Sequence, residues 1–188
     1  MESVLDRVIK QNTENVNLLK TKDYNIFSVL QIQSKEVLIC RMIADLLNPR
    51  GQHGAGAEYL KIFLRDCLGM EKMDTKLADQ AIVTAEYAID DERRIDIVIE
   101  MGSYFLPIEV KIYAADQKSQ CFDYYQYAKR RDAQAKVYYL TLDGHRPGKD
   151  STSSGSQSVP EEDIVCLSFR EHILNWLKAC KSCENTGM

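Results

Sequence analysis

The stretch RIDIVIEMGSYFLPIEVK, residues 94–111, contains the pattern that decides the fold. In its first half isoleucine alternates with other side chains, a period of two that is typical of a β-strand with one buried face. The pair Gly102-Ser103 is a two-residue turn signal, because glycine at the first turn position suits a type II′ hairpin. Residues 94–100 and 104–113 are therefore expected to form the two strands of an antiparallel hairpin.

This turn length also predicts which side chains face one another. Asp96 falls directly opposite Glu109, and the Cβ atoms of such a pair are ~5 Å apart. Lys111 shares the face of Glu109, because side chains alternate along a strand, and Arg94 falls opposite Lys111. The prediction is a small patch of sheet that carries two carboxylates and two cations.

Two neighbouring carboxylates repel each other unless a cation lies between them. Mg²⁺ prefers one or two carboxylates together with water and phosphate oxygens, so Asp96 and Glu109 suit this ion, and the Val110 carbonyl adds a further oxygen. Lys111 beside a metal-bound water would orient it or stabilise negative charge in the transition state, and Arg94 suits an anionic substrate. The spacing alone leaves a second interpretation open, a surface hairpin whose charged side chains form solvated ion pairs.

A helix is expected after this hairpin, from Asp116 as its N-cap to about residue 131. Gln117, Gln120 and Tyr124 would lie along one stripe of that helix and face the carboxylates. Their amide and phenol groups suit contacts with a phosphate backbone, so the three are candidate substrate-binding residues. The alternative is that Tyr124 is a core aromatic and that both glutamines are solvent-exposed.

The remaining periodicity predicts helices that precede and follow the sheet. Residues 1–33 are expected to form a helical N-terminal extension, and the serine-rich loop 143–163 is expected to be flexible. A capping box is expected to open the last helix. Its inward side chains are expected to be Ile173, Trp176, Leu177 and Cys180. The other expected ranges are helices over 34–47 and 57–68, and strands over 81–89, 137–142 and 164–167.

Length and charge limit the kinds of protein that this chain can be. Its 188 residues fit one domain, and its net charge of −4 excludes a protein that coats nucleic acid through bulk positive charge. No apolar run reaches the ~20 residues that span a bilayer, and residues 1–7 lack an apolar signal core. A cytoplasmic location without a membrane partner is therefore expected. The six cysteines are scattered and are expected to be reduced thiols.

Two motifs around the hairpin resemble those of a known family. Asp96 followed by Glu109-Val110-Lys111 resembles the Asp…Glu-x-Lys signature of the PD-(D/E)XK nuclease superfamily. The stretch QCFDY, which ends at Tyr124, resembles the Gln-x-x-x-Tyr motif of its RecB-like and lambda-exonuclease-like members.

The N-terminal half extends the resemblance to one branch of that superfamily. The stretches NIFSVL (25–30) and LLNPRGQHG (46–54), with Glu36 between them, are similar to a largely uncharacterised bacterial branch. The resemblance covers about residues 24–178, although Ile95 stands where the literal motif has proline.

The resemblance implies a single domain over residues 1–188, of class α/β (α+β), with a restriction-endonuclease-like αβββαβ core in which helices flank a mixed sheet. It implies that Asp96 and Glu109 bind Mg²⁺ or Mn²⁺ and that Lys111 is the catalytic lysine. Glu36 matches an acidic residue of the first core helix that can hold a metal-bound water or a second ion. The alternative is a first-turn glutamate that the helix dipole favours.

Two further residues are weaker candidates. His53 lies in a glycine-rich loop, where it would contact the substrate or only shape the turn, and the absence of another His or Cys nearby in the sequence favours the structural role. Glu86 lies on the expected strand 81–89, at a position that is often acidic in the branch that this chain resembles.

The expected function is that of a metal-dependent nuclease that hydrolyses phosphodiester bonds, with DNA rather than RNA as the expected substrate. Two alternatives keep the same fold without turnover: a nucleic-acid-binding module, and an interaction module of a defence or toxin complex. The candidate protein partners are a second copy of the chain, in a homodimer, and a defence-system protein. The chain ends soon after the Trp176 helix, whereas the related branch tends to continue. It is therefore expected to be either a short member or a fragment of a longer protein.

Overall fold

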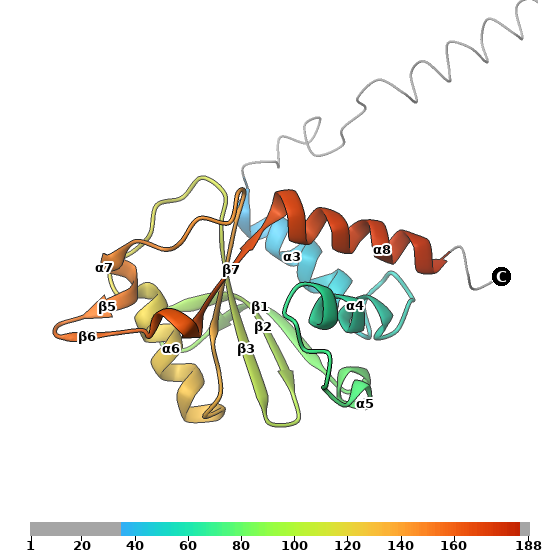
Figure 1. Ribbon diagram of the computed structural model, residues 1–188, viewed down its shortest axis with the longest axis horizontal. Coiled ribbons are helices and arrows are strands. Elements are labelled where there is room, and N and C mark those ends of the chain that lie inside the picture. Colours follow the sequence, from blue (N-terminus) through green and yellow to red (C-terminus); the bar gives the residue numbers. More distant parts are fainter. Residues whose placement is uncertain (1–34, 185–188) are drawn as a thin grey trace, which may run out of the picture. The chain divides into compact units, whose positions relative to one another are not determined.

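The computed structural model describes residues 35–184, and within this part helices flank a five-stranded mixed sheet (Figure 1). The first three strands of the sheet are antiparallel neighbours, and the last two continue parallel to the third. The order across the sheet is β1 (Ile82–Ala88), β2 (Arg94–Met101), β3 (Tyr104–Lys111), β4 (Val137–Thr141) and β7 (Ile164–Ser168).

The four longest helices lie around this sheet. They are α3 (Glu36–Leu47), α4 (Glu58–Asp66), α6 (Gln120–Arg131) and α8 (Leu174–Glu184). Along the chain, α3, the three antiparallel strands, α6 and β4 give the order αβββαβ. The predicted core and its mixed sheet are therefore confirmed.

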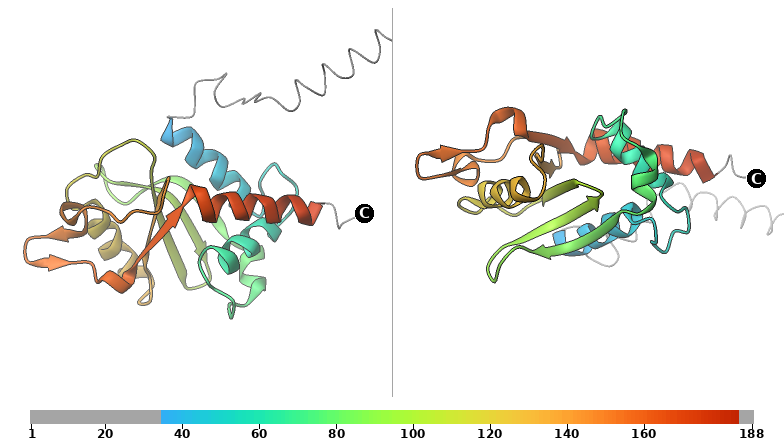
Figure 2. Two further views of the ribbon diagram at one scale, coloured as in Figure 1. Left: turned by 45° about the horizontal axis from the view of Figure 1, so that its top comes forward. Right: turned by 90° about the horizontal axis from the view of Figure 1, so that it is seen from below.

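Two hydrophobic clusters show which helices cover which face of the sheet (Figure 2). In the first cluster α3, α4 and α8 pack with Ile97 and Ile108. In the second, α6 packs with Val98 and Tyr139. Because side chains alternate along a strand, Val98 of β2 and the odd-numbered positions of β3 face α6, and at the start of β2 Ile95 joins the same cluster.

The β2–β3 hairpin has the register predicted from its turn. Ile97 lies opposite Ile108, and Met101 lies opposite Tyr104 directly beside the turn. Gly102 has a φ of 57°, the left-handed value that the first position of a type II′ turn requires. The register on which the site prediction depends is therefore confirmed.

The prediction that Asp116 caps a helix was wrong. The helix α6 begins four residues later, at Gln120. The Asp116 carboxylate instead accepts hydrogen bonds from the Tyr139 hydroxyl at 2.6 Å and from the Gly148 backbone N–H at 2.7 Å. These long-range partners engage the side chain that would otherwise have capped the helix, so the chain between β3 and α6 is a loop.

The segment 143–163 contains regular structure, contrary to the expectation of a polar loop. It forms α7 (Lys149–Thr152), the ribbon of β5 (Ser153–Ser154) and β6 (Gln157–Ser158), and a 3₁₀ turn at Glu161–Asp163. Ser151 is fully buried, and its hydroxyl accepts a hydrogen bond from the backbone N–H of Cys121 at the start of α6. The flexibility of this segment stays a prediction.

Other expectations differ from the structure in detail. The helix α5 (Thr75–Asp79) was not predicted. In the last helix Trp176 is fully buried, but Leu177 is 37% exposed and does not face the core. The N-terminal extension predicted over 1–33 lies outside the described residues. No helix within residues 35–184 is long and apolar enough to span a membrane.

The contrast between Trp176 and Leu177 gives a test of the packing of α8. The Trp176 indole N–H donates to the Tyr59 backbone carbonyl at 2.8 Å, and its ring meets Phe63 edge-on at 5.3 Å. We expect Trp176→Ala to lower the free energy of unfolding by ~3–5 kcal/mol, as for other large buried side chains. Leu177→Ala, the control on the same helix, should lower it by less than ~1.5 kcal/mol. Urea unfolding followed by far-ultraviolet circular dichroism measures both, and equal losses would contradict this packing.

Candidate active site

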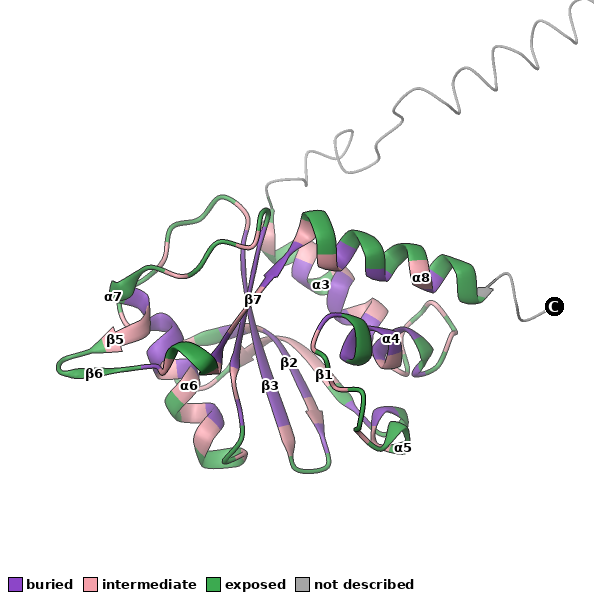
Figure 3. Cartoon of the chain, viewed as in Figure 1, coloured by how far each residue is buried: buried purple, intermediate pink, exposed green. Residues whose placement is uncertain are grey.

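The candidate site lies on the α6 face of the sheet, where β2 begins and β3 ends. The hairpin pairs Ile97 with Ile108, so the next residues along the two strands, Asp96 and Glu109, are neighbours. The Val110 backbone N–H donates to Asp96 Oδ2 at 2.8 Å and holds this carboxylate against β3. Figure 3 shows that β3 is buried along most of its length. The site is therefore set into the sheet rather than carried by a loop.

The Glu109 carboxylate is buried, with 1% of the residue exposed. Its Oε1 accepts hydrogen bonds from Lys111 Nζ at 2.6 Å and from Gln120 Nε2 at 2.7 Å. Its Oε2 is buried and has no hydrogen-bond partner among residues 35–184. Burial, reinforced by the neighbouring Asp96 carboxylate, raises the pKa of Glu109 to about 8. One oxygen of this carboxylate thus has two hydrogen-bond donors in place of water, and the other oxygen has none.

Asp96 and Lys111 complete the charged group. Burial raises the pKa of Asp96, although the Val110 N–H and the Lys111 ammonium act in the opposite direction. Burial acts to lower the pKa of Lys111, but the adjacent Glu109 carboxylate outweighs it and leaves that pKa raised. Lys111 is therefore a charged ammonium group held directly beside two carboxyl groups.

Gln120 and Tyr124 are buried on the face of α6 that meets the sheet. Gln120 Nε2, which binds Glu109, also lies 3.1 Å from the Tyr124 hydroxyl. That hydroxyl donates in turn to the backbone carbonyl of Arg94. The structure thus brings both residues to the carboxylates, where they tie α6 to β3 and to the start of β2. It agrees with the interpretation of Tyr124 as a core aromatic and contradicts that of Gln120 as solvent-exposed.

Glu36 is the first residue of α3, and it binds the chain that follows Lys111. Its Oε1 accepts hydrogen bonds from the backbone N–H groups of Ile112 at 2.7 Å, Tyr113 at 2.9 Å and Ala114 at 3.0 Å. Burial acts to raise the pKa of Glu36, but these three donors and Lys111 together lower it. The side chain therefore anchors the end of β3, a contact that neither interpretation of the sequence included.

Arg94 and Gln117 are predicted substrate contacts whose side chains, within residues 35–184, form no hydrogen bond or ion pair with Asp96 or Glu109. Arg94 is exposed and pairs with Ala88 of β1 at the first position of β2. Gln117 is exposed in the loop before α6, where its Oε1 accepts from Arg93 Nη1 at 2.8 Å. Gln117 lies off the expected stripe because the helix begins only at Gln120.

His53 lies at the other end of the sheet. Its loop follows the C-terminal end of α3, and in that loop Arg50 donates to the Ala81 carbonyl, just before β1. Ile82, the first residue of β1, pairs with Glu100 near the end of β2, whereas Asp96 lies near the start of β2. Both ring nitrogens of His53 contact backbone groups of its own loop, and the ring stacks on Tyr59 at 4.6 Å. The structure thus favours the structural role of His53.

Arg93 is a residue near the site that the sequence did not suggest. Its guanidinium donates to Asp123 of α6 at 3.0 Å and to the Lys118 carbonyl at 2.6 Å, in addition to Gln117. It thereby joins the start of β2 to the loop before α6. No local pattern marks this residue, because its partners are 24–30 residues away along the chain.

Glu86 is held away from the carboxylates by an ion pair. It adopts a φ of 54°, which is unusual for a residue other than glycine, and it interrupts the pairing of β1 where β2 carries Asp96. Its carboxylate pairs with Arg41 of α3 at 2.6 Å. Glu86 therefore belongs to the contact between β1 and α3.

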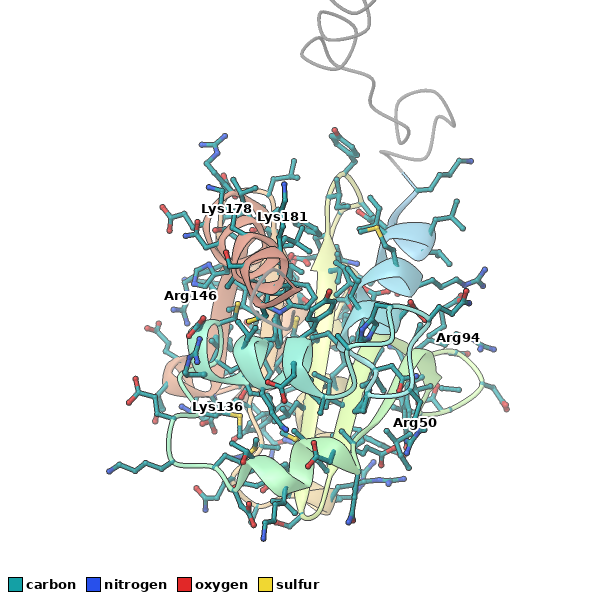
Figure 4. The ribbon with its side chains drawn as sticks, turned by 90° about the vertical axis from the view of Figure 1, so that its right-hand side faces the viewer. Arg50, Arg94, Lys136, Arg146, Lys178 and Lys181 are labelled. Carbon is teal, nitrogen blue, oxygen red and sulfur yellow. The ribbon has the colours of Figure 1, made fainter. Side chains whose placement is uncertain are left out.

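The cations that Figure 4 labels lie on two sides of the described part of the chain. In Figure 4, Arg50 and Arg94 lie on one side of the view, and Lys136, Arg146, Lys178 and Lys181 lie on the other. The net charge of the whole sequence is −4.

The donor set of the site suits a hard divalent cation. Within the described residues there is no cluster of three or more His, Cys, Asp or Glu side chains that could hold a metal. Asp96 and Glu109 supply two carboxylates, however, and the buried Glu109 Oε2 is an oxygen that lacks a donor. Mg²⁺ commonly binds to one or two carboxylates and takes its other ligands from water and phosphate. The residues present therefore fit such an ion.

Comparison with known proteins agrees with this geometry. The sequence model of the PD-(D/E)XK nuclease superfamily matches residues 24–187. The searches of curated proteins and of solved structures found no match. With a match over most of its length and an αβββαβ core that carries Asp96, Glu109 and Lys111 at the end of one hairpin, the chain belongs to the PD-(D/E)XK nuclease superfamily.

Proposed function

We propose that the chain is a nuclease that uses Mg²⁺ or Mn²⁺ to hydrolyse phosphodiester bonds in DNA. The observation that supports this best is the buried Glu109 Oε2, which lacks a partner and belongs to a carboxyl group beside that of Asp96. An ion pair with a purely structural role would gain nothing from a second carboxylate or from an unpaired buried oxygen. DNA is proposed because the Gln-x-x-x-Tyr helix resembles that of RecB-like and lambda-exonuclease-like nucleases.

Each side chain of the site would have a different role in hydrolysis. Asp96 and Glu109 would hold the ion together with the Val110 carbonyl, and a bound divalent ion polarises phosphate oxygens and lowers the pKa of water. Lys111, kept charged by Glu109, would orient the attacking water and stabilise the negative charge that develops on the phosphate. Gln120 would hold the orientation of Glu109 from α6.

Glu109→Gln should stabilise the metal-free protein, and more so at alkaline pH. The pKa of Glu109 is raised from 4.5 to about 8 in the folded chain, so the folded state holds the proton more tightly than the unfolded chain does between these values. Stability is therefore lost as pH rises from about 4.5 toward 8, whereas glutamine does not ionise. Melting curves in EDTA should place the variant above the parent at pH 8 and closer to it at pH 5. An equal difference at both pH values would contradict the raised pKa.

Divalent metal should stabilise the parent protein through the same two carboxylates. Binding to the folded state raises stability by RT ln(1 + [L]/Kd), or ~1–3 kcal/mol at saturating metal, so the melting temperature should rise with millimolar Mg²⁺ or Mn²⁺. Asp96→Asn and Glu109→Gln should abolish the rise. Glu100→Gln is the matched control, because Glu100 is on β2 with Asp96 but pairs with Arg131. A parent melting curve that millimolar Mn²⁺ leaves unchanged would count against a metal site.

Lys111→Met should remove catalysis while it preserves metal binding. The variant keeps the apolar stem but loses the ammonium group, and the loss of one such charge typically costs ~10²–10³ in rate. Lys129→Met, which removes an ion pair between α6 and Asp163, should leave the rate unchanged. The measurement is single-turnover cleavage of plasmid, linear and single-stranded DNA, and of RNA, with Mg²⁺, Mn²⁺ or EDTA.

Two results would decide against this mechanism. A Lys111→Met variant that cleaves as fast as the parent would exclude the role given to Lys111. A parent that binds DNA but shows no metal-dependent cleavage of any substrate would favour a binding module with this fold.

A further inference from the structure

Tyr113 presents an exposed aromatic ring beside the proposed catalytic centre. It is 69% exposed, more than any other large hydrophobic residue between 35 and 184. No hydrogen bond or ring contact of its side chain occurs within that part of the chain. It follows Lys111 by two residues, which span at most ~7 Å of chain. A large ring left in solvent at this place has no role in the packing of the described fold.

The backbone that carries this ring is held firmly. The Tyr113 N–H is the middle one of the three consecutive donors that Glu36 Oε1 accepts. A lowered pKa keeps the Glu36 carboxylate ionised, which strengthens these hydrogen bonds. The ring therefore projects from a fixed point rather than from a free loop. Such an arrangement lowers the entropy cost of binding a ligand.

The surroundings of Tyr113 favour a flat apolar ligand over a phosphate. Val37 and Leu38, the two residues after Glu36, are 42% and 40% exposed in the first turn of α3. Ile112 and Ala114, which flank Tyr113, are uncharged, and the nearest cation along the chain is Lys111 of the site itself. Exposed aromatic side chains beside a nucleic-acid site typically stack on bases, because every base has a π face.

We propose that the Tyr113 ring stacks on an unpaired nucleobase next to the scissile phosphate, so that the enzyme acts on DNA that is single-stranded at the cleavage site. This inference rests on the proposed function. The Cα atom of Tyr113 is at most ~7 Å from that of Lys111, so the ring projects from a point close enough to reach a base next to the phosphate that Lys111 would contact. In a duplex both faces of each base are covered by neighbouring bases. Only an unpaired or frayed base offers a face to the ring.

The test compares Tyr113→Ala with Tyr113→Phe on a single-stranded oligonucleotide. Binding is measured by fluorescence anisotropy in Ca²⁺ or EDTA, and cleavage by single-turnover kinetics in Mg²⁺ or Mn²⁺. Tyr113→Ala should weaken binding about 5- to 150-fold, the range found for loss of one aromatic stack, with a smaller effect on the rate at saturating enzyme. Tyr113→Phe retains the ring and should stay within about threefold of the parent. Ile82→Ala, which removes an exposed apolar side chain at the far end of β1, should change neither.

A set of oligonucleotides with one abasic position each separates stacking from a loss of folding. The parent should bind weakly when the abasic position coincides with the stacked base, and Tyr113→Ala should lose nothing further there, because the ring and the base are coupled. Tyr113→Ala that binds and cleaves single strands like the parent would overturn the inference, as would equal losses at every abasic position. Faster cleavage of duplex DNA than of single strands would also overturn it.

The failure of this inference can be told apart from that of the proposed function. If the parent cleaves DNA and Tyr113→Ala changes neither binding nor cleavage, the proposed nuclease function holds and the stacking role of Tyr113 is excluded. A parent that cleaves nothing removes the nuclease, and the anisotropy and abasic series still decide whether Tyr113 stacks on a base. A parent that neither cleaves nor binds nucleic acid overturns both.

Discussion

The burial of the Glu109 carboxylate is the constraint on which the rest of the site depends. A carboxylate removed from water is strongly destabilising unless donors replace its hydration. Here Lys111 of the same strand and Gln120 of α6 both bind one oxygen of Glu109. The hydrogen bond from Gln120 therefore has two effects: it replaces part of the hydration of Glu109, and it fixes α6 on the sheet. The second oxygen, left without a donor beside Asp96, makes the metal-free site the weak point of an otherwise well-packed face.

The division of roles around this carboxylate follows from which groups are already satisfied. Gln120 and Tyr124 have their polar atoms engaged with Glu109, with each other and with the Arg94 carbonyl, so they support the site more than they face solvent. Glu36 likewise binds three backbone N–H groups, and its part in the proposed chemistry is to hold the chain beyond Lys111. The unpartnered Glu109 oxygen remains for a metal ion. The part of the Lys111 ammonium that does not bind Glu109 and the exposed ring of Tyr113 remain for a substrate.

The features that could be predicted from the sequence are those that local rules determine. A period of two and a Gly-Ser turn are enough to set the register of β2 and β3, and hence the neighbourhood of Asp96 and Glu109. The boundary of α6 could not be predicted in the same way. Asp116 has the chemistry of an N-cap, but it is taken by Tyr139 and Gly148, which come later in the chain. With the Asp116 carboxylate engaged in these two hydrogen bonds, the helix begins at Gln120 and Gln117 lies in the loop before it.

The same distinction explains why the role of Glu36 was open at the level of sequence. Its partners are 76 to 78 residues away, and they are backbone groups, which leave no signature in side-chain identity. A motif can mark such a residue as important without indicating what it binds. In the structure Glu36 has a mechanical role, because the strand that carries Glu109 and Lys111 ends where Glu36 binds the backbone. The geometry of the charged group is thus kept by a helix on the opposite side of the sheet. Both sides of the sheet therefore contribute to the site, α6 through Glu109 itself and α3 through the backbone that follows it.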